Sequence, residues 1–164
     1  KYNFRHVSTG DLLRSEIAKE TELGKKAKAL IEAGNLVDDS TVVKMIESEI
    51  DNNPSVKGFL FDGFPRTTAQ AEQLDKMLEK RGNKIEKVIS FIIDDKKVFE
   101  RIKHRAEIEN RKDDAEPATI QNRINKYNCK TEPLIGYYKK CDKYFEINGD
   151  GEIDEIFARV IKLL

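Results

Sequence analysis

The sequence has no excess of charge of either sign. Its 164 residues carry 30 Lys and Arg side chains and 30 Asp and Glu side chains, so the formal net charge at pH 7 is zero. Proteins that bind duplex nucleic acid or an anionic membrane over a broad surface carry a strong positive field. We therefore expect neither partner, and any binding of a polyanion must rest on a local group of basic residues.

Cysteine is scarce, and long apolar runs are missing. Cys129 and Cys141 are the two cysteines, and no histidine stands beside either of them. Their place in a helix-rich segment favours two reduced, partly buried thiols over a disulfide or a metal site, so no zinc is expected. No apolar stretch approaches the length that spans a membrane, and no signal-peptide pattern is present. These features are typical of a cytoplasmic protein.

Short apolar runs alternate with helical patterns along the sequence. Strands are predicted over residues 4–8, 56–61, 88–93 and 143–147. Apolar residues at helical spacing fill the segments between these runs. This alternation predicts one α/β domain over residues 1–164, built as a doubly wound parallel sheet with right-handed crossovers.

Two segments of this pattern carry further predictions. The run "VISFII", residues 88–93, is apolar on both faces, which is typical of a central strand covered by helices. The charged stretch that follows, residues 104–118, is predicted as a solvated surface loop.

An acid and an arginine flank the turn after the second predicted strand. In "GFLFDGFPRTTAQAEQL" the apolar run ends at Asp62, Gly63 and Pro65 shape the turn, and Arg66 projects from it. Ligands of parallel sheets bind beyond the carboxyl ends of the strands, where these residues stand. Arginine holds phosphate through paired hydrogen bonds, and an aspartate at the end of a buried strand can hold magnesium beside nucleotide phosphates. Taken alone, Asp62 is equally well explained as a turn-forming residue.

Six of the nine arginines stand where loops should converge or around the charged stretch. They are Arg14, Arg66, Arg101, Arg105, Arg111 and Arg123. In a neutral protein this grouping favours a phosphorylated ligand. Each arginine taken singly is better explained by pairing with a nearby surface acid.

Five segments together carry a resemblance to a known family. "STGDLLR", "NLVDDSTV", "GFLFDGFPRTTAQA", "NRKDD" and "NRINKYNCKTEPLIGYY" resemble the successive signatures of the adenylate kinases, in order and at similar spacings. The resemblance covers essentially the whole chain. It implies a sheet of the P-loop kinase type, a small helical AMP-binding subdomain over residues 8–38 and a short lid over residues 105–116, without the cysteines of zinc-bearing lids.

The resemblance also implies an activity and a set of site residues. The activity is Mg²⁺-dependent phosphoryl transfer from ATP to AMP, giving two ADP, in a monomer. The residues implied to bind AMP are Thr9, Arg14, Asn35, Leu36, Val37, Gly63, Arg66, Gln70, Arg111 and Arg123. Those implied to bind ATP are Arg101, Arg105, Gly149, Asp150 and Gly151.

Particular roles follow from the matching positions. Thr9 and Gln70 would contact the adenine of AMP, and Arg14 and Arg66 its phosphate. Asp62 would organise magnesium, through water. The residues implied to act in catalysis are Arg66, Arg101, Arg111 and Arg123.

The sequence departs from the family pattern in two places. It contains no Gly-x-x-x-x-Gly-Lys-Ser/Thr motif, the phosphate-binding loop that is called the cradle below. The resemblance begins at the end of the family's first helix. We therefore expect a break one strand wide between the strand at residues 56–62 and "VISFII", because the family's first strand lies in the middle of the sheet. The segment from Arg111 to Arg123 is also one residue longer than the family pattern, at "AEPAT".

Two other functions remain open from the sequence. One is a kinase for the pyrimidine monophosphates UMP or CMP, against which Thr9 and Gln70 argue. The other is a nucleotide-binding fragment without catalytic activity, which the missing cradle favours.

The missing cradle leads to a prediction for the chain as it is printed. A protein beginning at Lys1 should make no detectable ADP from ATP and AMP, although weak AMP binding can survive. Preorganised donors of this kind lower a reaction barrier by about 3 to 4 kcal/mol each, and several are missing. A coupled assay for ADP checks this, and measurable turnover by the pure chain would contradict it.

Overall fold

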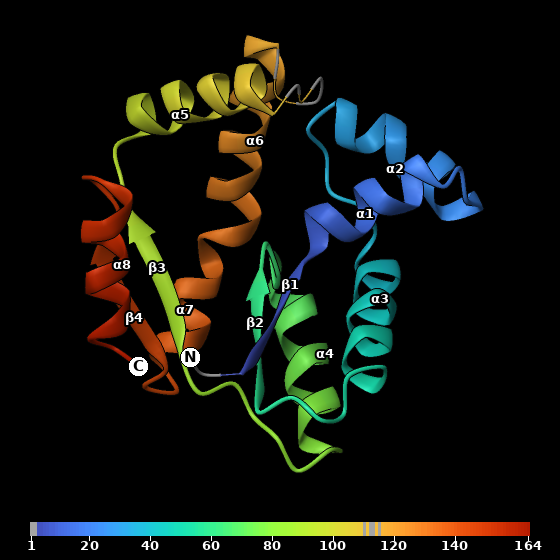
Figure 1. Ribbon diagram of the computed structural model, residues 1–164, viewed down its shortest axis with the longest axis vertical. Helices are drawn as coiled ribbons and strands as arrows, with labels where there is room; N and C mark the ends of the chain where they lie inside the picture. Colours follow the sequence, from blue (N-terminus) through green and yellow to red (C-terminus); the bar gives the residue numbers. More distant parts are fainter. Residues whose placement is uncertain (1–2, 110, 112–113, 115) are drawn as a thin grey trace.

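The computed structural model describes residues 3–109, 111, 114 and 116–164 (Figure 1). Its strands are β1 (Phe4–Ser8), β2 (Gly58–Asp62), β3 (Val88–Ile92) and β4 (Tyr144–Asn148). Its helices are α1 (Thr9–Ala18), α2 (Glu22–Glu32), α3 (Asp39–Asp51), α4 (Thr68–Glu79), α5 (Asp95–Ile108), α6 (Pro117–Lys126), the π-helical turn η2 (Tyr127–Thr131), α7 (Pro133–Lys139) and α8 (Ile153–Ile161). The predicted alternation of strands and helices is confirmed.

The four strands form two parallel pairs. Strand β1 pairs with β2, with Ser8 opposite Asp62, and β3 pairs with β4. In the described part of the chain, no hydrogen bonds join β2 to β3. A cavity of about 2010 Å³ lies between the pairs and is lined by residues of both, including Leu60 and Phe91. The predicted break in the sheet is therefore found at the predicted place.

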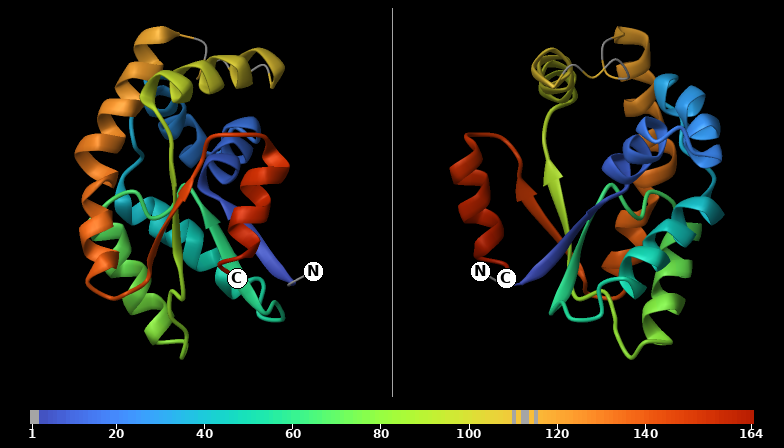
Figure 2. Two further views of the ribbon diagram at one scale, coloured as in Figure 1. Left: turned by 90° about the vertical axis from the view of Figure 1, so that its left-hand side faces the viewer. Right: turned by 45° about the vertical axis from the view of Figure 1, so that its right-hand side comes forward.

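The prediction that helices cover both faces of "VISFII" is wrong. Phe91 and Ile92 of β3 are 51% and 49% exposed. Helix α8 packs beside β4 in both views of Figure 2, and its Ile153 and Phe157 are exposed as well. A pair of strands buries little on its own, because an apolar face is covered only by a neighbouring layer.

The main core lies on the β1–β2 side of the molecule. Val7 of β1 packs in one cluster with Leu13 of α1, Ile46 of α3 and Leu74 of α4. Ile46 and Leu74 are completely buried. Each lies three or four positions from other buried residues of its own helix, Ile46 from Val42 and Ile50 in α3 and Leu74 from Ala71 and Leu78 in α4, so each helix turns one apolar face to the core. This core holds the carboxyl ends of β1 and β2 in place.

Polar caps begin the helices that follow the strands. Ser8 accepts a hydrogen bond from the backbone N–H of Asp11, and Thr67 accepts one from Gln70 at 3.1 Å. Asp94 does the same for Lys96 after β3. A capping side chain satisfies an N–H group that has no partner within the helix. The caps therefore fix where the chain turns from strand to helix after β1, β2 and β3.

The charged stretch is helical at both ends, so its prediction as a loop over residues 104–118 is wrong in part. Helix α5 continues to Ile108, because Ala106 is buried and holds its last turn against the protein. Helix α6 already begins at Pro117. Residues 110, 112, 113 and 115 of the predicted lid lie outside the described residues. Among the described helices, none has the length and apolar character needed to cross a membrane.

Candidate functional site

The turn after β2 brings three predicted site residues together. Gly63 has a φ of +68°, a backbone conformation that residues with a side chain rarely adopt, so a substitution there would strain the turn. The Gly63 carbonyl accepts a hydrogen bond from Arg66 Nε at 2.8 Å and one from the Thr9 hydroxyl at 2.9 Å. Thr9 is 4% exposed. The start of α1 is thus fastened to the turn.

Gln70 lies buried behind this turn, with an exposure of 2%. Its Oε1 accepts a hydrogen bond from the backbone N–H of Arg66 at 2.7 Å. Its Nε2 donates to Oδ1 of Asp39 at 2.7 Å. The side-chain amide is therefore held from both ends.

Arg14 lies one helical turn into α1. Its Nη2 donates to Oδ1 of Asp11 at 2.5 Å. This hydrogen bond is the main reason that the pKa of Asp11 is lowered, and the charge of Arg111 adds to the effect. Arg111 must therefore lie close enough to α1 for its charge to act there.

A buried carboxylate gathers three more arginines. Asp114 is completely buried, with Arg105 Nη2 at 2.5 Å from its Oδ2 and Arg123 Nη1 at 2.6 Å from its Oδ1. Arg111 Nη1 lies 4.0 Å from the same side chain. Asp114 was missed as a site residue in the sequence, although it belongs to the "NRKDD" motif. Its position between Arg111 and Arg123 in the sequence could have indicated this role, but the segment was interpreted as a solvated loop.

Arg66 lies beside this group. Arg66 is exposed and lines the cavity, yet the surrounding protein lowers its pKa by desolvation. The charges of Arg123, Arg14 and Arg105 lower the pKa further, and Asp62 opposes them. Guanidinium groups from four separate segments therefore share one region. An anion entering this region would be stabilised by all of them.

Most of the residues that were predicted to bind AMP are among the many residues that line the large cavity. Its lining includes Thr9, Arg14, Asn35, Leu36, Val37, Gly63, Arg66, Gln70 and Arg123, together with Asp62. The remaining member of that set is Arg111, which lies 4.0 Å from Asp114, the carboxylate that also pairs with Arg123. The loop at Asn35 also contacts α6, since Asn122 donates to the carbonyl of Ala33 at 2.7 Å.

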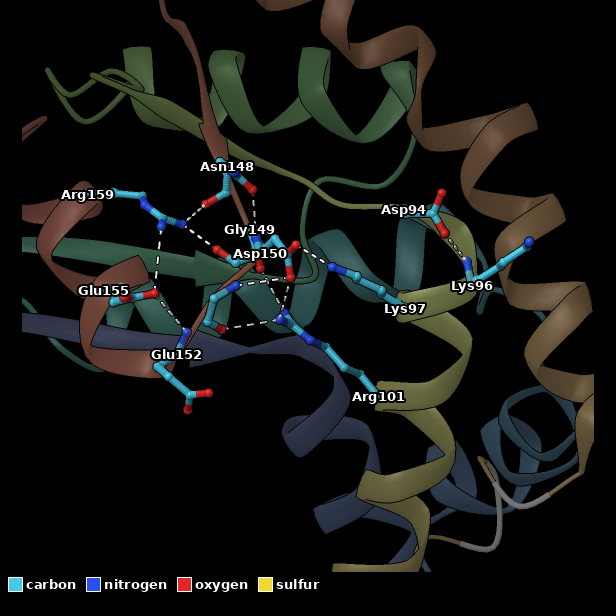
Figure 3. A network of polar contacts seen from close by, with 11 residues as sticks. Asp94, Lys96, Lys97, Arg101, Asn148, Gly149, Asp150, Glu152, Glu155 and Arg159 are labelled. Carbon is cyan, nitrogen blue, oxygen red and sulfur yellow. Dashed lines mark hydrogen bonds and ion pairs between the residues drawn. The ribbon is translucent and has the colours of Figure 1, made fainter.

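A second group lies on the β3–β4 side (Figure 3). Arg101 donates to the carbonyl of Gly149 at 2.9 Å and to that of Gly151 at 3.4 Å. Asp150 forms an ion pair with Lys97, which is the main cause of its lowered pKa. The residues that were predicted to bind ATP are thus divided, because Arg101 lies with residues 149–151 and Arg105 lies with Asp114.

The sequence also led to predictions about a magnesium site and about the two cysteines. Asp62 ends β2 with its side chain 65% exposed, and His6 Nε2 lies 3.4 Å from its Oδ2. In the residues that the structure describes, no group of three or more His, Cys, Asp and Glu side chains is placed to hold a metal ion. Cys129 and Cys141 are both free, but they are exposed and not partly buried as predicted.

The buried carboxylate generates a stability prediction. Asp114→Asn should lower the free energy of unfolding by about 3 kcal/mol, because it removes the counter-charge from gathered arginines. Urea unfolding of both proteins measures the difference. The matched control is Glu107→Gln at an exposed position of α5, which should change the same quantity by less than about 0.5 kcal/mol. Equal stability of Asp114→Asn and the unchanged protein would contradict the assigned role.

Comparison with known proteins identifies the family of this chain. The family model described as adenylate kinase matches residues 1–143. The adenylate kinase of Flavobacterium psychrophilum is 45% identical over 164 residues, which are all of this chain and 86% of that protein. The adenylate kinase of Phocaeicola vulgatus is 42% identical over 161 residues, which are 98% of this chain and 85% of that protein. The chain therefore belongs to the adenylate kinase family.

Proposed function

We propose that this protein is an adenylate kinase, which transfers the terminal phosphoryl group of ATP to AMP and gives two ADP. The observation that carries the proposal is the group of arginines around Asp114 and Arg66, beside a large cavity. Phosphoryl transfer depends mainly on aligning the reactants and neutralising the charge of the moving group. Fixed guanidinium groups supply both.

AMP would bind on the β1–β2 side of the cavity. Arg66 and Arg14 would hold its phosphate, since a planar guanidinium can form two hydrogen bonds to one phosphate. Thr9 and Gln70 would contact the adenine, and the backbone of residues 35–37 would line the pocket. Buried polar groups discriminate strongly between ligands, because a ligand without the matching groups leaves them unpaired.

ATP would bind on the β3–β4 side. Arg101 already holds the carbonyls of the turn at residues 149–151, so the phosphate-binding and adenine-binding parts would be joined. Arg105, Arg111 and Arg123 would lie along the path of the transferred group. We also propose that residues 8–38, in which α1 and α2 pack together, form the AMP-binding subdomain, and that residues 105–116 form the lid.

Magnesium would be organised by Asp62 through water. Mg²⁺ keeps several waters in protein sites and takes one or two carboxylates together with phosphate oxygens, so a single exposed carboxylate at a strand end suits it. When bound, the ion neutralises charge on the phosphates. The protein's own contribution at this point is the placement of Asp62 opposite Ser8 at the carboxyl ends of β1 and β2.

Nucleotide preference tests this function, measured in a protein in which the family's phosphate-binding loop and the strand before it are joined ahead of residue 1. ADP formation from ATP should be fastest with AMP as acceptor and much slower with UMP or CMP. A preference for a pyrimidine monophosphate would favour that related kinase activity instead. No transfer to any of the three acceptors would favour a nucleotide-binding protein without catalysis. Gel filtration of the same sample tests the expected monomer.

Arg66 provides a sharper test of the phosphate site. In the same protein with the phosphate-binding loop joined ahead of residue 1, Arg66→Lys should lower kcat/KM by about one to two orders of magnitude. A point charge cannot replace two charged hydrogen bonds of about 1.5 to 3 kcal/mol each. Arg5→Lys is the matched control, since Arg5 is exposed on β1 and pairs with Glu49. Near-full activity of Arg66→Lys would remove Arg66 from the phosphate site.

A further inference from the structure

Asp39 binds the side chain that is proposed to contact the adenine. It is the first residue of α3 and follows Asp38, which caps that helix by accepting from the N–H of Thr41. Oδ1 of Asp39 accepts from Gln70 Nε2 at 2.7 Å, and Oδ2 accepts from the Thr67 hydroxyl at 2.9 Å. Both oxygens therefore face the start of α4.

These contacts fix the orientation of the Gln70 amide. A carboxylate accepts hydrogen bonds and cannot donate them, so the Gln70 NH₂ group must face Asp39. The backbone N–H of Arg66 is a donor, so the Gln70 oxygen must face it. Turning the amide over would place oxygen against carboxylate and NH₂ against N–H. The contact to Asp39 is also charge-assisted and thus the stronger of the two.

A fixed amide offers a fixed pattern to a base. An amide has two N–H donors and two lone pairs on its oxygen. In the described part of the chain, Asp39 uses one donor and Arg66 one lone pair, which leaves one of each for a ligand. Adenine pairs its N1 acceptor and 6-amino donor with such an edge. A 6-oxopurine carries the reverse pattern, a donor at N1 and an acceptor at position 6, and would need the amide turned over.

We propose that Asp39 is a positioning residue for base selectivity, which holds the Gln70 amide in the orientation that accepts 6-aminopurine monophosphates and rejects 6-oxopurine monophosphates. This inference rests on the proposed binding of AMP beside Gln70. It does not depend on phosphoryl transfer. Asp39 also ties α3 to the start of α4, and a purely structural tie would alter the affinity for both kinds of purine equally.

Equilibrium binding of AMP and IMP to the 164-residue chain tests the proposal. Calorimetry gives the ratio of Kd for IMP to Kd for AMP in each protein. Asp39→Asn should lower this ratio about tenfold, because asparagine can present either a donor or an acceptor to Gln70. Asp39→Ala should lower it in the same direction and serves as the second variant if the first does not fold. Thermal melting followed by circular dichroism establishes that each variant is folded.

Two further variants separate the possible outcomes. Asp38→Asn removes a carboxylate one residue away and keeps a good helix cap, so its ratio should equal that of the unchanged chain. Gln70→Leu should lower the ratio, since it removes the amide. If Gln70→Leu lowers the ratio and the Asp39 variants leave it within twofold, or if Asp38→Asn lowers it equally, Asp39 does not set selectivity, and the proposed function stands. If the unchanged chain binds neither nucleotide, the proposed AMP site is wrong and this inference fails with it.

Discussion

One completely buried carboxylate organises the charged centre of this protein. Asp114 is held between Arg105 and Arg123, with Arg111 next to it. Without a shared anion, these guanidinium groups and Arg66 would repel one another. The pKa of Arg66 is lowered first by desolvation and then further by the charges of Arg123, Arg14 and Arg105. The free-energy cost of bringing these positive charges together is therefore offset during folding and does not have to be offset by the binding of a phosphate. A phosphate would then meet donors that are already in place, which is the arrangement that favours electrostatic catalysis.

The two strand pairs divide the proposed nucleotide sites between them. The β1–β2 pair carries the main core and ends at Thr9, Asp62 and the turn to Arg66. The β3–β4 pair ends near Arg101 and residues 149–151. Helices α5 and α6, which meet at the top of Figure 1, supply Arg105 and Arg123. The acceptor side and the donor side would therefore face each other across the cavity, with the arginines of these helices in between.

Local patterns predicted the elements well and the long-range contacts poorly. Helix caps such as Ser8 and Asp94, and the apolar spacing of α3 and α4, depend on residues within a few positions of each other. The motif around Asp62 and Arg66 also predicted its own turn, since Gly63 has to adopt a positive φ there. Most of the residues implied to bind AMP lie among the many residues that line the large cavity, and their assignment to AMP stays a prediction.

The remaining features depend on segments that are far apart in the sequence. The burial of Asp114 requires arginines from both α5 and α6, so a charged stretch that reads as solvated forms a buried centre. The contact between Asp39 and Gln70 joins two helices across 31 positions. Phe91 is exposed because, among the residues that the structure describes, no strand is hydrogen-bonded between β2 and β3, and no property of the "VISFII" run itself can indicate this.

A crystal structure of this protein with AMP bound tests the central claim most directly. The phosphate of AMP should lie within hydrogen-bond distance of the Arg66 and Arg14 guanidinium groups, with the adenine edge at the Gln70 amide and the Asp39 contact intact. A phosphate held instead by Arg101 and the turn at residues 149–151, or an adenine away from Gln70, would contradict the account.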